Sequence, residues 1–251
     1  MYFLLTSTPD RSARLPSLLD TLRRQTLMPT RVILTIARRY DATRFRNPAF
    51  EMPSAVFRSS ASLPRLDVHT IDTDRGPLSK YFGVNASAID AIDSPHTRLS
   101  ARSHAIAVVG DDDMFYGTTF VEDYACAVAR APAGTVFSSG IDFDCGKLRT
   151  CVMGFRGVAM RVPMLAALPS MNAWPHECLL ADDVVITYYL VRCNSFNIRR
   201  LKLRSKYKFD DAFAWSNSSI NTYHRQRRFG VNRACTMQLH SHRRAALCGP
   251  S

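Results

Sequence analysis

The sequence contains no apolar run long enough to cross a membrane. A membrane-spanning helix needs about 18 consecutive apolar residues, and every apolar run here is shorter. The opening residues MYFLLTSTPDR hold only a short apolar run, which stops before it reaches the length of a signal-peptide core. We therefore expect a cytoplasmic protein, with peripheral contact to a membrane as an open alternative.

Cysteine is sparse and has no paired pattern. The seven cysteines form no CxxC pair, and their number is odd. Scattered single cysteines in an enzyme-sized chain are typical of reduced thiols, although a turn could bridge Cys145 and Cys151. The cysteines thus favour a reducing, cytosol-like compartment.

Several familiar catalytic motifs are also missing. There is no GxxxxGK[ST] loop, no GxGxxG after a strand and no GxSxG elbow. ATPase, dinucleotide-dependent and serine-hydrolase functions therefore have no support. The seven histidines show no zinc-binding spacing with cysteine.

Acidic residues are scarce in the last quarter of the chain. From Arg192 onward there are 13 Lys and Arg residues but only two Asp and Glu, so nearly all of the formal net charge of +12 lies there. Such a block indicates a polyanionic partner, namely phosphate groups, anionic lipid or nucleic acid. A merely well-solvated face is the alternative.

What the chain does have is an alternation of strand-like apolar runs and helical periods. Strands are predicted over 2–8, 31–37, 66–71, 105–110, 135–140 and 195–203, with two short strand-like pieces inside 149–161. Helices are predicted over 13–24, 78–92, 118–130 and 177–192, with a short one over 219–228, and 38–64 is a long polar connection. This order predicts one α/β domain with a mostly parallel sheet covered by helices on both faces.

Polar residues follow several of the predicted strands. The carboxyl ends of parallel strands meet at one edge of a sheet, where ligands bind. That rule places the segments 8–11, 37–39, 72–80 and 111–113 along a single rim. We expect the binding site there.

Three adjacent carboxylates, Asp111, Asp112 and Asp113, follow the buried strand AIAVVG. Like charges repel and raise each other's pKa, a cost that a divalent cation relieves. Mg²⁺ and Mn²⁺ commonly use one or two carboxylates together with nucleotide phosphates. A solvated acidic turn is the alternative, but the position after a buried strand favours a metal site.

Two further segments have chemistry-bearing residues. DRGPLSK at 74–80 joins a strand to a helix, where amides can bind phosphate and Lys80 adds positive charge; an ordinary Gly-Pro turn is the alternative. Asp182 and Asp183 open an apolar helical stretch. One of them could cap the helix, or the apolar flank could raise its pKa as a general base requires.

Taken in order, these segments resemble the GT-A glycosyltransferases, particularly small family-2-like enzymes. LLTSTPDRSARLPSLLDTLRRQTLMPTRVILTIA is similar to their first βαβ unit, and DRGPLSK to their Gly-Pro-x-Thr-Lys element, with Ser79 in place of Thr. VVGDDDMFY is similar to the Asp-x-Asp element. ADDVVITYYL is similar to the later Glu-Asp element, with Asp182 in place of Glu. The resemblance covers roughly residues 2–203 and, more weakly, 217–235.

The resemblance implies a metal-dependent, inverting glycosyltransferase that uses Mn²⁺ or Mg²⁺. It would move a sugar from a UDP- or GDP-linked donor to a hydroxyl of a glycan, lipid-linked or protein acceptor. Residues 1–115 would form the nucleotide-sugar-binding half and 116–251 the acceptor half, whose basic segment could contact an anionic surface. Nucleic acid is not expected as a partner.

The resemblance also implies a set of site residues. Asp113 and Asp111 would hold the metal, and Asp183 is the favoured base, with Asp182 as the alternative. The donor would contact Thr8, Pro9, Arg11, Asp74, Arg75, Gly76, Lys80, Asp111 and Asp112. Arg156 and Arg161 are further candidates for donor or acceptor contact.

Two other functions remain open from the sequence. A nucleotidyltransferase shares this fold and the carboxylate–metal arrangement, but would not need Asp182 and Asp183 as a base pair. A basic nucleic-acid-binding module would explain the basic last quarter through phosphate contacts. It would not explain an acidic triplet on the binding rim.

Overall fold

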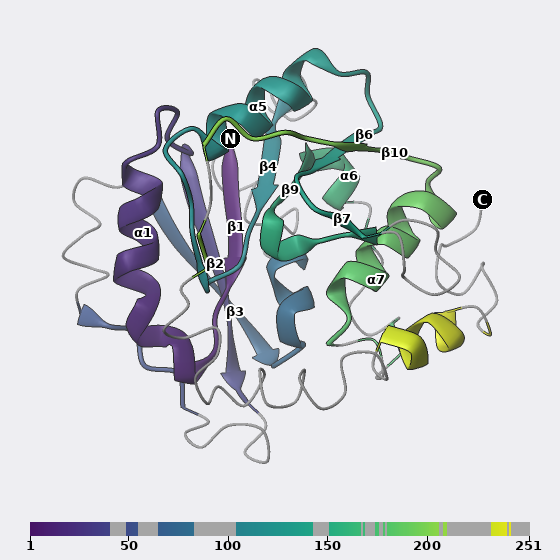
Figure 1. Cartoon of the computed structure of the whole chain (residues 1–251). Helices are drawn as coiled ribbons and strands as arrows, with labels where there is room; N and C mark the ends of the chain where they lie inside the picture. Colours follow the sequence, from purple (N-terminus) through teal and green to yellow (C-terminus); the bar gives the residue numbers. More distant parts are fainter. Residues whose placement is uncertain are drawn as a thin grey trace, which may run out of the picture.

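A seven-stranded sheet forms the centre of the molecule (Figure 1). The computed structural model describes residues 1–40, 49–54, 65–82, 104–142, 151–166, 168, 174–175, 178, 180–205, 208–209, 232–239 and 241. The strands lie in the order β10-β6-β9-β4-β1-β2-β3. Their bounds are Tyr2–Thr6 (β1), Arg31–Arg39 (β2), Arg65–Thr73 (β3), Ile106–Val109 (β4), Thr135–Ser138 (β6), Val158–Arg161 (β9) and Asn197–Arg200 (β10).

The sheet is mixed but mostly parallel. β1 pairs in parallel with β2 and β4, β2 with β3, and β6 with β10. β9 alone runs against its neighbours, pairing antiparallel with both β4 and β6. The predicted α/β fold with a mostly parallel sheet is confirmed, whereas the reversed direction of β9 was not foreseen.

Alternating side chains of the central strands pack into two apolar cores, one on each face of the sheet. Phe3 and Leu5 of β1 point to the face covered by α1 (Leu15–Arg23) and α5 (Phe120–Arg130). Leu4, between them, joins the core on the other face with α7 (Asp182–Tyr188). Successive side chains of a strand point to opposite faces, so a strand buried on both sides reads as a continuous apolar run.

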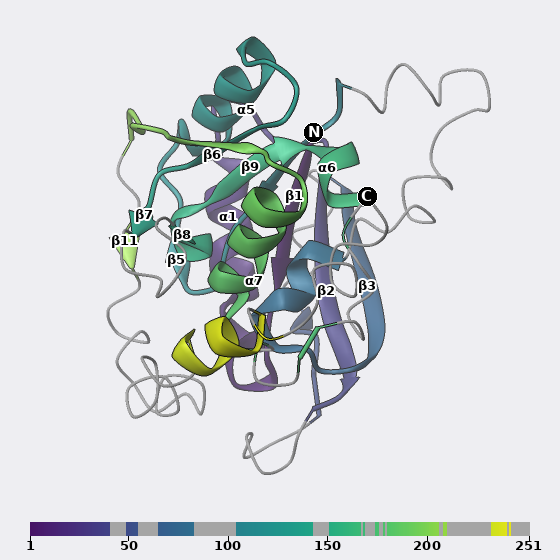
Figure 2. The same ribbon diagram turned by 90° about the vertical axis from the view of Figure 1, so that its right-hand side faces the viewer.

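The face with α7 also holds other short elements. A 3₁₀ helix, Gly76–Phe82, buries Leu78 and Tyr81 against β1 and β2. A helix at 232–239 lies beside α7 in both views (Figure 2). α6 (Val162–Ala166) follows directly on β9. The sheet is therefore covered on both faces, as expected.

Several expected elements differ in extent. The helix predicted over 177–192 begins only at Asp182 and continues as a π-helical turn, Tyr189–Cys193. Of the helix predicted over 78–92, the structure describes only the 3₁₀ segment. The helix predicted over 219–228 and most of the 38–64 connection lie outside the described residues.

Short elements complete the described fold, and among them only Cys151–Val152 lies where a short strand was predicted, within 149–161. β5 (Met114–Phe115) pairs antiparallel with β11 (Lys208–Phe209), and β7 (Ile141–Asp142) pairs with β8 (Cys151–Val152). Two 3₁₀ turns, Pro9–Arg14 and Gly154–Arg156, precede α1 and β9. Strands of two residues are too short to show a period.

The prediction of reduced thiols is wrong for four cysteines. Cys178 and Cys235 form a disulfide across 57 residues of sequence, and Cys151 and Cys193 are also disulfide-bonded. Only Cys126 is a free thiol among the described cysteines. Pairing depends on how close two Cβ atoms lie in the fold, which sequence spacing does not reveal. The cysteines therefore no longer support a reducing compartment.

The described helices are all too short or too polar to traverse a lipid bilayer.

Candidate active site

The loops that follow β1, β2, β3 and β4 meet at one rim of the sheet and are tied to each other. The Tyr40 hydroxyl, after β2, donates to the Ser7 carbonyl and accepts from the Ala37 amide, both at 3.0 Å. The Asp74 amide, after β3, donates to the Arg39 carbonyl at 3.1 Å. The four loops are therefore held as one polar edge, as the strand-end rule predicts.

Arg11 is fixed from two sides within this edge. Thr8 precedes the 3₁₀ turn that carries Arg11, and its carbonyl accepts the Arg11 amide at 2.9 Å. The buried Arg11 guanidinium lies 2.8 Å from Asp112 Oδ1 and 3.3 Å from Asp113 Oδ2. Ser7 Oγ donates to the other Asp112 oxygen at 2.6 Å. Both oxygens of Asp112 are therefore occupied, and its carboxylate orients Arg11.

Lys80 occupies the centre of the other half of the site. Its side chain is fully buried, and its ammonium pairs with Asp111 and, at 2.8 Å, with Asp182 Oδ2. The ammonium also lies 5.5 Å from the centre of the Tyr81 ring. Burial lowers the pKa of Lys80, but the attraction of Asp111 and Asp182 outweighs it and leaves the pKa well above its ordinary value. Lys80 is therefore a permanent cation that links the end of β4 to the start of α7.

Tyr116 holds the backbone of Asp111, a role that the sequence did not indicate. Its hydroxyl accepts from the Asp111 amide at 2.7 Å and donates to the Asp111 carbonyl at 2.8 Å. Gly110 leaves room for this hydroxyl, because a Cβ there would lie only 2.2 Å from it. The glycine before the acidic run is thus needed for the close approach of Tyr116.

Asp113 has a buried carboxylate oxygen that no described residue uses. Its Oδ1 is buried and has no hydrogen-bond partner among the described residues. Burial raises the pKa of Asp113 to about 6 against the pull of Arg11, and the charges of Asp111 and Asp112 add to the rise. A buried carboxylate oxygen without a partner is costly, and a bound cation would remove that cost.

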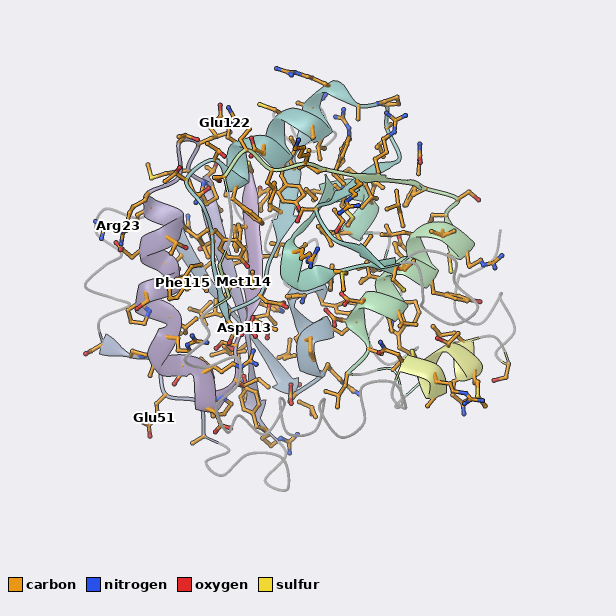
Figure 3. All side chains as sticks on the ribbon, viewed as in Figure 1. Arg23, Glu51, Asp113, Met114, Phe115 and Glu122 are labelled. Atoms are coloured by element: carbon orange, nitrogen blue, oxygen red, sulfur yellow. A yellow bond between two sulfur atoms is a disulfide. The ribbon has the colours of Figure 1, made fainter. Side chains whose placement is uncertain are left out.

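A small pocket lies next to Asp113. It has a volume of about 230 Å³ and lies between the start of α1 and β5, with Arg14, Ser17 and Met114 among its walls. Figure 3 places Asp113 and Met114 near the middle of the molecule, whereas Arg23 and Glu122 lie at its periphery. The pocket brings a small ligand group within reach of Asp113.

The carboxylates of the rim do not form a cage around a cation by themselves. Among the residues that the structure describes, no three Asp, Glu, His or Cys side chains converge as metal ligands. Asp111 Oδ1 is paired with Lys80 and Asp112 Oδ1 with Arg11, whereas the buried Oδ1 of Asp113 has no hydrogen-bond partner among the described residues. These residues fit a cation held by one or two carboxylates together with ligand phosphates, the usual mode for Mg²⁺.

The two aspartates at the start of α7 have different partners. Asp182 is paired with Lys80, whereas Asp183 Oδ1 accepts the Gly154 amide at 2.5 Å. Burial, and then repulsion from Asp182, raise the pKa of Asp183 well above its ordinary value, although the Gly154 amide and Lys80 act in the opposite direction. A carboxylate with a raised pKa is the better proton acceptor, and Asp183 has that property here.

Gly154 allows this approach because it has no side chain. A Cβ at Gly154 would lie 3.1 Å from both Asp183 Oδ1 and Lys80 Nζ, and 3.2 Å from Asp182 Oδ2. The turn before β9 therefore packs its backbone directly on the charged cluster. No role for Gly154 was predicted from the sequence.

The remaining predicted residues divide between the rim and the far edge. Gly76 has a φ of 63°, and its amide donates to Asp74 Oδ1 at 2.8 Å, so this turn requires glycine. Pro9 and Arg75 are half-buried at the rim. Arg161 lies at the other end of β9, where it contacts His104 and the Ala131 carbonyl. The proposal of a substrate contact for Arg161 is therefore wrong, because the antiparallel direction of β9 takes it away from the rim.

Comparison with known proteins identifies the fold. TarS 1–349 of S. aureus in complex with UDP matches with a TM-score of 0.51 and 13% identity over 82% of this chain and 59% of that chain. A second structure of S. aureus TarS 1–349 gives a TM-score of 0.52 with the same identity and coverage. The chain thus spans about three fifths of the length of these structures.

A third similar structure is the mannosyltransferase PcManGT from Pyrobaculum calidifontis in complex with GDP-Man and Mn²⁺. It has 15% identity over 79% of this chain and 54% of that chain, with a TM-score of 0.49, which is too low to support an inference. The chain matches no protein-family model and no curated protein. At these identities the likeness shows the fold alone: a mixed, mostly parallel α/β sheet that matches GT-A glycosyltransferase structures.

Proposed function

We propose that this chain is a glycosyltransferase that moves a sugar from a nucleoside-diphosphate sugar to an acceptor hydroxyl in a single, inverting displacement. The observation that carries the proposal is Asp183, a carboxylate with a raised pKa on the same rim as the partnerless oxygen of Asp113. One carboxylate suits proton removal and the other suits a cation beside phosphates. The GT-A-like fold is consistent with this division.

We assign removal of the proton from the acceptor hydroxyl to Asp183. Its carboxylate would accept the proton of the acceptor hydroxyl while that oxygen attacks the anomeric carbon and the bond to the donor phosphate breaks. Asp182 is less suited, because its carboxylate is already engaged by the buried Lys80 ammonium at 2.8 Å. The Gly154 amide holds Asp183 in place at 2.5 Å.

The leaving nucleoside diphosphate is assigned to the opposite side of the rim. Asp113, with Asp111, would hold Mn²⁺ or Mg²⁺, and such a cation stabilises negative charge that develops on a leaving diphosphate. Arg11, fixed by Asp112, and Lys80 add positive charge to the same region. Thr8, Pro9, Arg75 and the turn at Gly76 complete the proposed donor site.

The proposal assigns residues 1–115 to the donor and 116–251 to the acceptor. TarS carries UDP in its structure. We propose UDP as the nucleotide, with GDP as the alternative, and a glycan, lipid-linked or protein acceptor. We also propose that the basic last quarter of the chain contacts an anionic surface.

A screen of nucleotide-sugars tests the proposal. Purified protein is incubated with UDP- and GDP-sugars with Mn²⁺ or with EDTA, and released products are separated by ion-exchange chromatography. We expect one donor to yield a nucleoside diphosphate only in the presence of the cation. Release of pyrophosphate would instead identify nucleotidyl transfer.

Donor binding provides an independent readout of the same proposal. The productive donor should raise the melting temperature of the protein when Mn²⁺ is present. The variant Asp113→Asn should lose this stabilisation, whereas Asp20→Asn, which removes an exposed carboxylate on α1, should keep it. If no nucleotide-sugar is hydrolysed or stabilises the protein, the proposed reaction is excluded.

A further inference from the structure

A second and larger pocket lies on the same rim, where β6 and β10 end. Its volume is about 740 Å³, within the range of sites that hold small organic ligands. Its walls come from Ser139, Arg156, Arg200, the stretch Leu201–Leu203 and Ser205. β6 and β10 are parallel to β1 and β4, so this pocket and the proposed donor site share one edge of the sheet.

The described walls of this pocket carry positive charge only. Arg156, Arg200 and Lys202 line it, and no described acidic side chain does. Arg200 and Lys202 make no ion pair or side-chain hydrogen bond with any described residue. An anion bound in this hollow would be attracted by all three cations.

The pocket is held in shape by the surrounding backbone. The Leu201 amide donates to the Ser138 carbonyl at 2.8 Å. Further along, the Arg204 amide donates to Asp123 Oδ2 at 2.8 Å, and Ser205 Oγ accepts the Thr119 amide at 3.1 Å. Both ends of the segment that carries Lys202 are therefore anchored, one to β6 and the other to α5.

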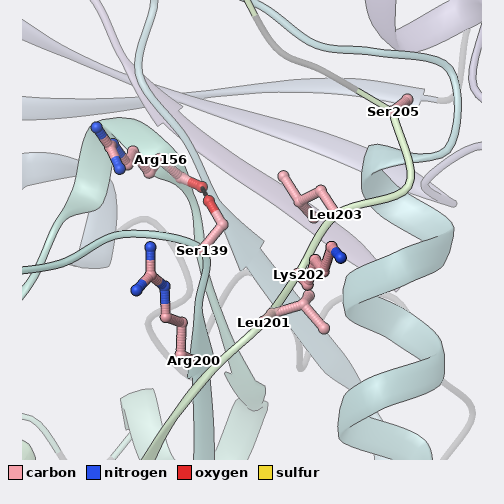
Figure 4. A pocket seen from close by; sticks show the side chains of 7 residues that line it. All are labelled: Ser139, Arg156, Arg200, Leu201, Lys202, Leu203 and Ser205. Carbon is pink, nitrogen blue, oxygen red and sulfur yellow. Dashed lines mark hydrogen bonds between the residues drawn. The ribbon is translucent and has the colours of Figure 1, made fainter.

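The Arg156 wall is equally well supported. Its carbonyl accepts the Ser139 hydroxyl at 2.5 Å and the Tyr124 hydroxyl at 2.8 Å. Its aliphatic stem lies over Gly140, where a Cβ would be 2.2 Å from Arg156 Cδ. In Figure 4 the guanidinium groups of Arg156 and Arg200 lie to the same side of Ser139. Two planar guanidinium groups on one side of a pocket suit an oxyanion such as phosphate.

The same turn connects this pocket to the proposed base. Gly154 donates its amide to Asp183, and Arg156, two residues later, lines the pocket. Two residues of chain span at most about 7 Å, so an acceptor could bind in the pocket and still reach Asp183. The proposed donor site lies on the other side of Asp183 along the rim, next to Lys80 and Asp111.

We propose that this pocket binds a phosphate group of the acceptor, so that the protein glycosylates a phosphorylated acceptor. The role of the bound molecule as an acceptor rests on the proposed sugar transfer. The anion site itself rests only on the geometry and charge of the pocket. Leu201 and Leu203 give the pocket an apolar wall as well, which suits the carbon skeleton to which the phosphate is attached.

Binding of glucose 6-phosphate tests the anion site directly. Calorimetric titrations in EDTA compare the wild type with the double variant Arg200→Ala/Lys202→Ala. The matched control Arg192→Ala/Arg199→Ala removes the same charge from exposed positions outside the described pocket walls. We expect the wild type and the control to bind alike, the double variant to bind at least about tenfold more weakly, and added salt to weaken binding.

Several results would overturn the anion site. They are absence of glucose 6-phosphate binding to the wild type, equal binding by the double variant, an equal loss in the control, or equal binding of neutral glucose. Inorganic phosphate binding as tightly as glucose 6-phosphate would show a site for the free ion and overturn the acceptor role. Melting curves of all variants report whether each is folded.

The acceptor role needs a separate measurement. Transfer from the productive donor is compared for phosphorylated glycans and for the same glycans after phosphatase treatment. We expect transfer to the phosphorylated form alone, and equal transfer to both would overturn the inference. If the wild type hydrolyses no nucleotide-sugar, the proposed function fails, while the titration result still decides for or against the anion site.

Discussion

The aspartates at positions 182 and 183 illustrate how one residue type takes two roles through its surroundings. Asp182 is neutralised by the fully buried Lys80, whereas Asp183 meets an amide and has a raised pKa. The sequence could place both residues at the start of a helix with apolar flanks. It could not rank them by their partners, because Lys80 and Gly154 come from distant parts of the chain.

Replacing Asp183 by Asn should abolish proton removal without disturbing the fold. Loss of a general base costs about 10²- to 10⁴-fold in rate, so we expect kcat for transfer to fall by at least about 10²-fold with an unchanged affinity for the donor. The variant should be at least as stable as the wild type at pH 7, because it removes a carboxylate whose pKa is raised by folding.

Asp182→Asn serves as the contrasting variant. It leaves the buried Lys80 with Asp111 as its remaining ion-pair partner, so its main effect should be a lower melting temperature. Steady-state kinetics and thermal unfolding of both variants separate the two roles. Wild-type turnover in Asp183→Asn would refute the assignment of Asp183 as the base.

Asp113 should make the stability of the metal-free protein depend on pH. Its pKa is about 6 in the folded state and 3.8 ordinarily, so the folded state binds the proton more tightly. The stability that protonation contributes is therefore fully present below about pH 4 and is lost as pH rises through 6. This rise in the pKa of Asp113 lowers the free energy of unfolding at neutral pH by about 3 kcal/mol, compared with its value at low pH.

Asp113→Asn should remove this dependence. We expect the variant and the wild type to melt alike near pH 4, and the variant to be more stable at pH 7 and above. Melting curves in EDTA from pH 4 to 8 measure the difference, and a difference that does not change with pH would contradict the assignment. Adding Mn²⁺ at pH 7 should raise the melting temperature of the wild type more than that of the variant.

At the scale of elements, the sequence predicted well where an apolar period is long. β1, β2 and β4 and the helices α1 and α5 lie where the pattern places them, because each buries a continuous face. The two-residue strands β5, β7 and β11 and the direction of β9 were missed. Hydrogen bonds between distant segments determine them, and no local pattern records which neighbour a strand will have.

The same limit applies to the candidate site. The strand-end rule brought Arg11, Lys80 and Asp111 to one rim, as the structure has them. Tyr116 and Gly154 were missed because each acts through a backbone contact or a backbone group. Arg161 was placed wrongly because its position depends on the direction of β9.

The turn Gly154–Arg156 should tolerate no side chain at its first residue. In Gly154→Ala the new methyl group would press on Asp183 Oδ1 and Lys80 Nζ at 3.1 Å, so these charged groups must move. These groups must give by a few tenths of an ångström, whereas a displacement of about 1 Å costs about 10²-fold in rate, so we expect a loss in transfer of less than about 10²-fold.

Gly134→Ala provides the control for this effect. Gly134 has a φ of 80° and precedes β6 at the opposite edge of the sheet, so alanine there should lower stability by about 1 kcal/mol through backbone strain. We expect it to keep the wild-type turnover. If the turnover of Gly134→Ala falls as much as that of Gly154→Ala, general destabilisation explains the loss, and displacement of Asp183 and Lys80 does not.

At the scale of the whole molecule, the Cys178–Cys235 disulfide joins the helix at 232–239 to the turn that leads into α7. Cys178 and Cys235 are fully buried, and the Ala181 amide donates to the Cys178 carbonyl at 3.0 Å. The crosslink therefore anchors a late segment of the chain beside the start of the helix that carries the proposed base.

Removing this crosslink should destabilise the protein. A disulfide that closes a loop of this length contributes about 2–4 kcal/mol, so Cys235→Ser should unfold at a clearly lower denaturant concentration than the wild type. Cys126→Ser, which removes a free thiol, should unfold like the wild type. Equal stability of Cys235→Ser and the wild type would show that the bond does not form in solution.

The reversed direction of β9 has a consequence for the chemistry of the rim. In an all-parallel sheet every strand ends at the ligand-binding edge, so this edge receives only the loops that follow strands. β9 begins at this edge instead. The turn before β9 therefore lies at the edge, where the Gly154 amide donates to Asp183 and Arg156 lines the larger pocket. One change of strand polarity thus gives the edge two kinds of loop, and the proposed acceptor pocket uses both: the segments that follow β6 and β10, and the turn that precedes β9.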